Sequence, residues 1–194
     1  MSNRYIIFFN LGTVEAGLYA AASKLPAIIN LASVIFQQAW QIAASKEYDD
    51  KCSRVFFSNV FKCYSAGILT FGSFVICSSD FLAVLMLKND FINAKNMLPL
   101  LILTAIINCY SIYFGTFYTA FKKNIMVMIS TIIGAIINIA ISLFFIDSYG
   151  VWACVIGSII CYMVIVLMRI YDTNKMINCL LYTSDAADDL TRVD

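Results

Sequence analysis

The sequence contains no histidine, and charged residues make up only 13% of it. Histidine is a frequent general base and the commonest metal ligand in proteins, so its absence removes the centre of most catalytic and metal sites. The seven cysteines form no CxxC pair. We expect most of them to be small apolar side chains inside helices. The sequence therefore predicts neither an enzyme nor a bound metal or cofactor.

Positive charge is also scarce. The net charge is +1, and the few lysines and arginines are scattered along the chain. A protein that binds nucleic acid needs a basic patch that neutralises phosphates. We therefore expect no nucleic acid among the partners.

Apolar residues are abundant instead, at 61% of the chain and a mean hydropathy of +0.83. Too few polar residues remain to coat a soluble globule of this size, which indicates an all-α protein of the lipid bilayer. A transmembrane helix needs roughly 20 apolar residues. The segments that meet this requirement are 18–44, 55–79, 96–121, 124–146 and 148–168. Pro26 predicts a kink in the first of them, and residues 147–150 a tight polar turn before the last.

The beginning of the chain holds a shorter apolar run. Residues 5–11 are too few to cross a membrane, yet they show no polar face. A helix lying on the membrane surface is one interpretation. The other, which we favour, is a transmembrane helix whose first half is missing.

Lysine and arginine counts beside the spans predict the orientation. One side collects Lys46, Lys51, Arg54, Lys122, Lys123, Arg169 and Lys175, and the other Lys24, Lys88 and Lys95. Cytoplasmic loops carry the excess of positive charge, so the first side is expected to be cytoplasmic. Residues 80–97 then form an outer connector.

An ordered series of short motifs resembles the second half of a transporter family. The motifs are Arg4, Gly12, Gly17-Leu18-Tyr19, Lys24-Leu25-Pro26, Phe36-Gln37-Gln38-Ala39-Trp40, Met97-Leu98-Pro99, Phe121-Lys122-Lys123-Asn124, Gly134-Ala135-Ile136-Ile137-Asn138 and Tyr149-Gly150-Val151-Trp152-Ala153. Their order and spacing over residues 3–175 are similar to those of bacterial polysaccharide (O-antigen) flippases. These belong to the multidrug/oligosaccharidyl-lipid/polysaccharide exporter superfamily. Asn3 departs from the pattern, because the family usually has an aspartate there.

The resemblance implies two six-helix bundles that face each other across a central cavity. Residues 1–178 would form the C-terminal bundle, with its first helix truncated and five further transmembrane helices. The missing N-terminal bundle of the same chain would be its partner. The implied location is the bacterial inner membrane, where the protein would contact membrane lipids and an undecaprenyl-pyrophosphate-linked oligosaccharide.

The last sixteen residues, Cys179–Asp194, differ sharply in composition from the rest. They read CLLYTSDAADDLTRVD and concentrate aspartates after a long apolar region. Their back-translation is similar to the adapter of transposase-based sequencing libraries read in frame. We therefore expect residues 179–194 to be a non-native tail, and a short native acidic tail is the alternative.

Polar side chains inside membrane spans are candidate site residues, because they are costly there unless they are paired or face water. The substrate-binding candidates are Arg4, Asn30, Gln37, Gln38, Trp40, Gln41, Asn108 and Asn138. Tyr110 and Tyr113 are weaker candidates of the same kind. Gly134 and Ala135 are expected to let two helices approach closely.

Each group of candidates has two interpretations. A guanidinium at Arg4 could bind a pyrophosphate with two parallel hydrogen bonds, or it could lie at the cytoplasmic interface. The amides could bind sugar hydroxyls or join helices. Trp40 could stack on a sugar or anchor a helix end at the interface. Lys122 and Lys123 could signal topology or attract anionic headgroups.

The function that these residues favour is flipping of the lipid-linked oligosaccharide from the cytoplasmic to the outer leaflet, by alternating access, for surface polysaccharide biosynthesis. The predicted spans contain no carboxylate, since Glu15 and Asp147 are expected in turns. A multidrug or peptidoglycan-precursor exporter of the same superfamily is the alternative. A non-catalytic membrane scaffold remains open, whereas a membrane enzyme lacks acid and base groups.

Overall fold

The computed structural model describes residues 2–46, 53–79, 96–120 and 124–191 and shows an all-α protein there. These residues form seven helices: α1 (Ser2–Leu11), α2 (Thr13–Ala22), α3 (Lys24–Lys46), α4 (Ser53–Cys77), α6 (Leu98–Ala120), α7 (Asn124–Tyr149) and α8 (Val151–Thr191). The predicted outer connector lies almost wholly outside the described residues.

Four of these helices are long and apolar enough to cross a membrane. Their candidate spans are Asn59–Cys77, Leu98–Thr119, Asn124–Tyr149 and Val151–Thr173. A fifth span results if α2 and α3 are counted as one helix bent by 42°. Four of the predicted spans are thus confirmed as single helices, and the first is confirmed as the bent pair.

The bend between α2 and α3 follows from Pro26. Proline has no backbone N–H, so the carbonyl of Ala22 loses the hydrogen bond that a continuous helix would give it. The proline ring also clashes with that carbonyl. The chain breaks at Ser23, whose N–H still donates to the carbonyl oxygen of Tyr19 at 3.0 Å. The kink predicted from Pro26 is therefore present, one turn before the proline.

Glycines mark two sharper reversals. Gly12, between α1 and α2, has φ of 94°, and Gly150, between α7 and α8, has φ of 56°. Side chains with a Cβ rarely adopt these left-handed conformations. The turn predicted over residues 147–150 is shorter than expected, because α7 continues to Tyr149 and only Gly150 reverses the chain. Glu15 accordingly lies in the first helical turn of α2, and Asp147 lies in the last helical turn of α7. The sequence had predicted both residues in turns between helices.

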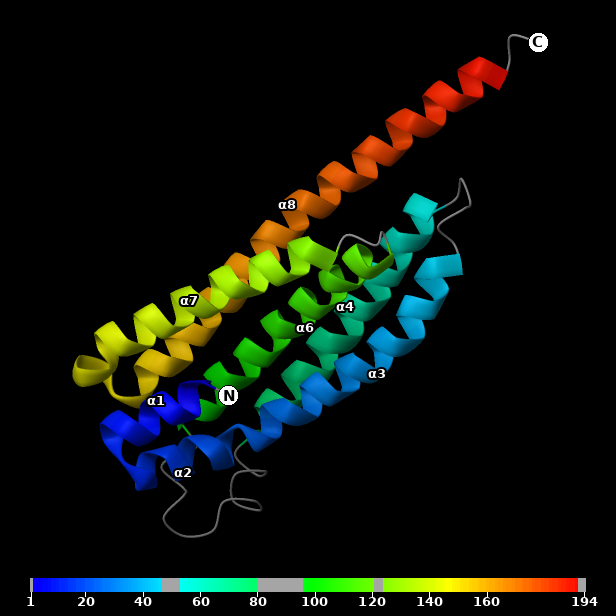
Figure 1. Cartoon of the computed structure of the whole chain (residues 1–194). Helices are drawn as coiled ribbons and strands as arrows, with labels where there is room; N and C mark the ends of the chain where they lie inside the picture. The colour runs from blue at the N-terminus through cyan, green and yellow to red at the C-terminus, as the bar shows by residue number, and fades with distance from the viewer. Residues whose placement is uncertain (1, 47–52, 80–95, 121–123, 192–194) are drawn as a thin grey trace.

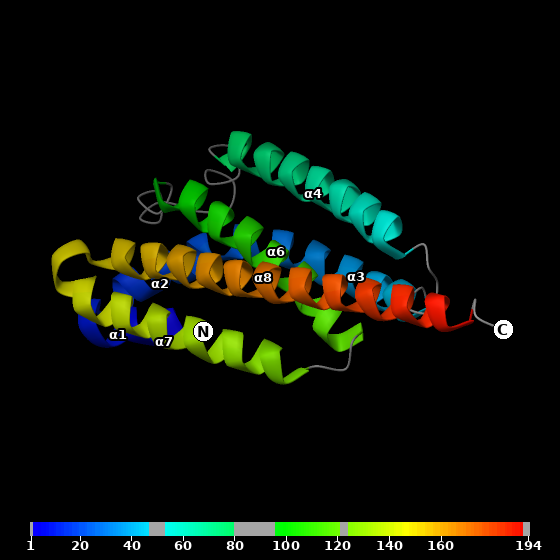
Figure 2. The same ribbon diagram turned by 90° about the horizontal axis from the view of Figure 1, so that it is seen from above.

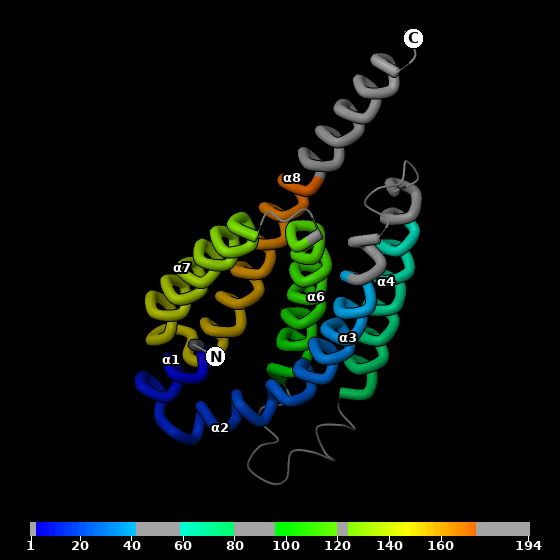
Figure 3. Tube along the Cα trace, turned by 45° about the vertical axis from the view of Figure 1, so that its right-hand side comes forward, coloured from blue at the N-terminus to red at the C-terminus, as the bar shows by residue number. Residues whose placement is uncertain are grey.

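The long helices lie side by side with α6 at the centre, in contact with α3, α4, α7 and α8 (Figures 1 and 2). Helix α4 lies at one edge of this layer. Helices α1 and α2 form a hairpin that packs against the ends of α7 and α8 near Gly150 (Figure 3).

The outer surface is strongly apolar. The most apolar 18-residue stretch of α7 has a mean hydropathy of 2.4, yet only 22% of that stretch is buried. Phe144 and Phe9 are 83% and 80% exposed. Such side chains would be unfavourable in water and favourable against lipid acyl chains. Helix length and hydropathy therefore identify a multi-pass membrane protein.

The interior contains two apolar clusters. One lies where the α1–α2 hairpin meets α6, α7 and α8, with Ile7, Leu98 and Val155 fully buried. The other joins α3, α4 and α6 through aromatic rings, among them Trp40, Tyr64 and Tyr113. The cavity described below is lined in part by Leu101 of the first cluster and Ala105 of the second.

Helices α7 and α8 pack closely at Gly134. A Cβ built on this residue would lie 2.5 Å from Cδ1 of Ile165 and 3.1 Å from Sγ of Cys161. Both distances are below ordinary van der Waals contact, so any larger residue requires the side chains of Ile165 and Cys161 to move. The close approach predicted at Gly134 is confirmed, whereas Ala135 lines the cavity described below.

Replacing Gly134 with leucine is expected to lower the free energy of unfolding by about 2 kcal/mol, because the new side chain overpacks the α7–α8 contact. Unfolding in mixed detergent micelles measures this change. Gly67 on α4 is the matched control, since a Cβ there meets no atom within 4 Å. Gly67→Leu should leave stability equal or slightly higher, because glycine is a weak helix former. Equal effects at both positions would contradict the close packing.

Candidate functional site

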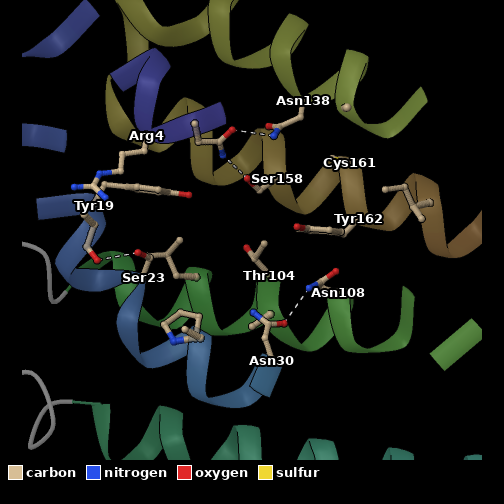
Figure 4. Close-up of a pocket in the computed structure, with 18 of the residues that line it drawn as sticks. Arg4, Tyr19, Ser23, Asn30, Thr104, Asn108, Asn138, Ser158, Cys161 and Tyr162 are labelled. Carbon is tan, nitrogen blue, oxygen red and sulfur yellow. Dashed lines mark hydrogen bonds between the residues drawn. The ribbon is translucent and has the colours of Figure 1, made fainter. Parts of the chain in front are cut away.

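A cavity of about 560 Å³ opens between the membrane-spanning helices. Six helices contribute to its wall, and much of that wall is polar (Figure 4). The polar residues that line it are Asn3, Arg4, Tyr19, Ser23, Asn30, Thr104, Asn108, Thr131, Asn138, Ser158 and Tyr162. Amides and hydroxyls both donate and accept hydrogen bonds. The cavity can therefore bind a ligand rich in hydroxyl groups.

Asn3 holds three helices together along one wall. Its Nδ2 donates to the carbonyl oxygen of Cys154 at 3.0 Å and to Oγ of Ser158 at 2.6 Å. Its Oδ1 accepts a hydrogen bond of 2.8 Å from Nδ2 of Asn138. Asn3 itself is only 7% exposed. Helix α1 is thus fixed to α7 and α8 by polar contacts.

The opposite wall carries a second amide pair. Nδ2 of Asn108 on α6 donates to Oδ1 of Asn30 on α3 at 2.9 Å. Figure 4 shows this pair across the cavity from Asn138 and Ser158. Both residues line the cavity and also join two helices. The two interpretations of the amides, as ligands of a substrate and as contacts between helices, are therefore compatible in this pair.

Arg4 brings positive charge to the cavity wall. Its side chain is exposed and lies beside Tyr19 in Figure 4, on the α1–α2 side of the cavity. A guanidinium presents five N–H donors in a planar fork, which matches the oxygens of phosphate or carboxylate groups. This end of the cavity can therefore accept an anionic group.

Four predicted candidates do not line the cavity: Gln37, Gln38, Trp40 and Gln41. Trp40 lies in the aromatic cluster, 4% exposed, with its ring centroid 5.9 Å from that of Tyr113. Tyr113 is also buried, and the hydroxyl of Tyr110 lies 2.6 Å from Oγ of Ser65. The structure therefore brings Arg4, Asn30, Asn108 and Asn138 together and leaves the remaining candidates apart. Lys122 and Lys123 lie outside the described residues.

Arg169 corrects one prediction. The sequence suggested a basic residue beside the last span, yet the side chain is 6% exposed and lies inside the candidate span of α8. Its guanidinium donates to oxygens of Ser111, Ser130 and Thr131. It therefore lies within the bundle between α6, α7 and α8, inside the candidate span rather than beside it.

Several polar lining residues escaped prediction: Tyr19, Ser23, Thr104, Thr131, Ser158 and Tyr162. Serine and threonine are common in apolar helices, where they can bond their own backbone. Thr104 does so here, donating to the carbonyl oxygen of Leu100 at 2.7 Å. Asn3 was recognisable only as a departure from a family pattern. No sequence signal distinguishes hydroxyls that face the cavity from those that do not.

No group of three or more cysteine, aspartate or glutamate side chains that could hold a metal ion gathers among the residues that the structure describes. No protein-family model, curated protein or solved structure matches the chain. Fold and hydropathy define it as an all-α, multi-pass membrane protein with four to five candidate spans.

Proposed function

We propose that this chain is the C-terminal bundle of a flippase that moves a lipid-linked oligosaccharide from the cytoplasmic to the outer leaflet of the bacterial inner membrane. The carried lipid would be of the undecaprenyl-pyrophosphate type. The observation that supports this most directly is the polar cavity among the membrane-spanning helices. The resemblance of the motifs over residues 3–175 to polysaccharide flippases supports it independently.

The cavity chemistry fits the two polar parts of such a substrate. Its amides and hydroxyls suit the hydroxyl groups of a glycan, and the guanidinium of Arg4 suits a pyrophosphate. The lipid tail would stay in the bilayer, against the apolar outer surface of the helices. A second bundle of the same complete protein would close the cavity, and rocking of the two bundles would give alternating access.

The described lining also favours this function over export of cationic drugs. Buried carboxylates would balance the charge of a drug cation most directly in a cavity of this kind. Among the described residues that line the cavity, there is an arginine and no aspartate or glutamate. An anionic, hydroxyl-rich substrate is the better match.

The proposal predicts that cavity amides matter for transport and that amides elsewhere on α3 do not. Asn108→Ala in the complete protein should lower glycan export roughly tenfold, since each lost hydrogen bond to substrate is worth about 1 kcal/mol and its partner Asn30 is left unpaired. Gln38→Ala is the matched control, because Gln38 is exposed on α3 and does not line the cavity. Surface glycan is measured in cells whose own flippase gene is deleted. Equal export by both variants would contradict the proposal.

A further inference from the structure

Arg169 is a buried cation inside a membrane-spanning helix. It lies in the candidate span Val151–Thr173 and is 6% exposed. Nε donates to Oγ of Ser130 at 3.2 Å, and Nη2 donates to Oγ1 of Thr131 at 3.1 Å. Nη1 donates to the carbonyl oxygen and to Oγ of Ser111, at 2.5 and 3.0 Å.

All of these acceptors are neutral oxygens. Arginine stays protonated in proteins, so the positive charge persists inside the bundle. A buried charge is unfavourable unless an opposite charge balances it. The nearby carboxylate of Asp172 accepts instead from the Tyr118 hydroxyl, at 3.4 Å. Among the described contacts of Arg169, the counter-charge is therefore missing.

The guanidinium lies directly behind the cavity wall. Thr131, which accepts a hydrogen bond from Arg169, is exposed and lines the cavity. Ile165, one turn before Arg169 on α8, also lines the cavity. The Thr131 hydroxyl donates to the carbonyl oxygen of Val127 at 2.7 Å, so it offers a lone pair to Arg169. On the other side, α6 packs closely against the guanidinium, since a Cβ on Gly115 would lie 3.0 Å from Nη1 of Arg169. Among the described hydrogen-bond partners of Arg169, Thr131 is the one that lines the cavity, so an anion in the cavity would approach the guanidinium beside Thr131.

We propose that Arg169 is a second anion-binding group of the cavity, which takes a phosphate of the carried lipid at the Thr131 edge. Four hydrogen bonds occupy a group that has five N–H donors. When the phosphate arrives, its oxygens replace Thr131 as acceptors of Nη2 and supply the missing negative charge. The identity of the phosphate as part of the carried lipid rests on the proposed function.

A purely structural role is the competing explanation, because the same contacts join α6, α7 and α8. The two roles differ in what a neutral variant changes. A structural clasp affects the stability of the protein without ligand. An anion-binding group affects the affinity of the folded protein for a diphosphate.

The test is binding of three probes to the purified full chain in neutral detergent: farnesyl diphosphate, inorganic pyrophosphate and phosphatidylglycerol. Affinity is obtained from the ligand-dependent rise in the unfolding midpoint. Arg169→Gln should weaken farnesyl diphosphate binding at least tenfold, on the order of one lost charge-assisted contact. The control is Lys62→Gln, which removes the same charge from an exposed position on α4 and should change nothing.

The probes also distinguish the sources of the phosphate. A loss of binding with farnesyl diphosphate, with or without inorganic pyrophosphate, supports the proposal. A loss confined to phosphatidylglycerol overturns it and assigns the site to a bulk membrane headgroup. Unchanged binding of all three probes by a folded Arg169→Gln variant overturns it as well.

Two further variants keep the test decisive if Arg169→Gln does not fold. Arg169→Lys retains the charge but loses the planar fork, so it should bind farnesyl diphosphate roughly three- to tenfold more weakly. Thr131→Val removes the neutral competitor and should bind at least as tightly as the parent. Affinity of Arg169→Lys equal to that of the parent chain would refute the proposal.

Glycan export is not measured in these experiments, so their failure leaves the proposed function standing, and failure of export leaves the binding result intact.

Discussion

Cells that carry an Arg4→Ala variant of the complete protein are expected to lose surface glycan export, by about 100-fold or to the limit of detection. The side chain lines the cavity, where a guanidinium can form two charge-assisted hydrogen bonds with a pyrophosphate. Each such bond is worth about 1.5–3 kcal/mol, and the loss of both removes most of the affinity for the anionic group. Surface glycan is quantified against total expressed protein in the membrane.

The matched control for Arg4 is Lys24→Ala. Lys24 is exposed at the beginning of α3 and is not among the residues that line the cavity. This variant removes one positive charge from another helix and should leave export unchanged. Arg4→Lys should retain part of the activity, because the charge remains while the bidentate geometry is lost. Export by Arg4→Ala at the parental level would remove Arg4 from the site.

The second large effect is expected at Asn3, on stability. Asn3→Leu should lower the free energy of unfolding by about 3 kcal/mol, because three hydrogen bonds are lost and Nδ2 of Asn138 is left without its acceptor. The measurement is equilibrium unfolding in mixed micelles, with α-helical content as the readout.

Asn10→Leu provides the control on the same helix. Asn10 is exposed, and its Nδ2 donates only to the carbonyl oxygen of Ile6 in its own helix, at 2.8 Å. Its replacement should change stability by less than about 0.5 kcal/mol. A double-mutant cycle between Asn3→Ala and Asn138→Ala should give a coupling energy of about 1 kcal/mol. Additive effects of these two substitutions would show that the Asn3–Asn138 contact does not stabilise the bundle.

The positions of the membrane spans could be predicted because hydrophobicity is a local property. The runs at 55–79, 96–121 and 124–146 each became one helix, within a few residues of the expected ends. The break at Ser23 followed from Pro26, which acts on its own helix. The end of α7 was less predictable, since Asp147, Ser148 and Tyr149 are typical turn residues and the helix nevertheless includes them.

The site was only partly predictable, because it depends on which faces of different helices meet. Asn30 and Gln37 are both amides of α3, yet only Asn30 lies opposite an amide of α6. Arg169 shows the same limit for charge. A basic residue near the end of an apolar run is typical of the interface, and its burial depends on Ser111, Ser130 and Thr131, which lie on two other helices. No periodicity within α8 contains that information.

For the residues beyond the last span, helical structure and native origin are separate questions. Helix α8 continues to Thr191, well past the candidate span that ends at Thr173. The proposal that 179–194 is a non-native tail concerns the origin of the sequence and stays a prediction. A genomic read across Asn178 that continues in the same coding sequence through these residues would contradict it.

We propose that this bundle forms part of a carrier for a lipid-linked, phosphate-bearing glycan. The most direct test of this proposal is reconstitution of the complete protein in liposomes with a fluorescent undecaprenyl-pyrophosphate-linked oligosaccharide, followed by quenching of the label on one leaflet. We expect the parental protein to equilibrate the label between leaflets and the Arg4→Ala variant not to do so. Liposomes with the parental protein that flip the label no faster than protein-free liposomes would contradict it.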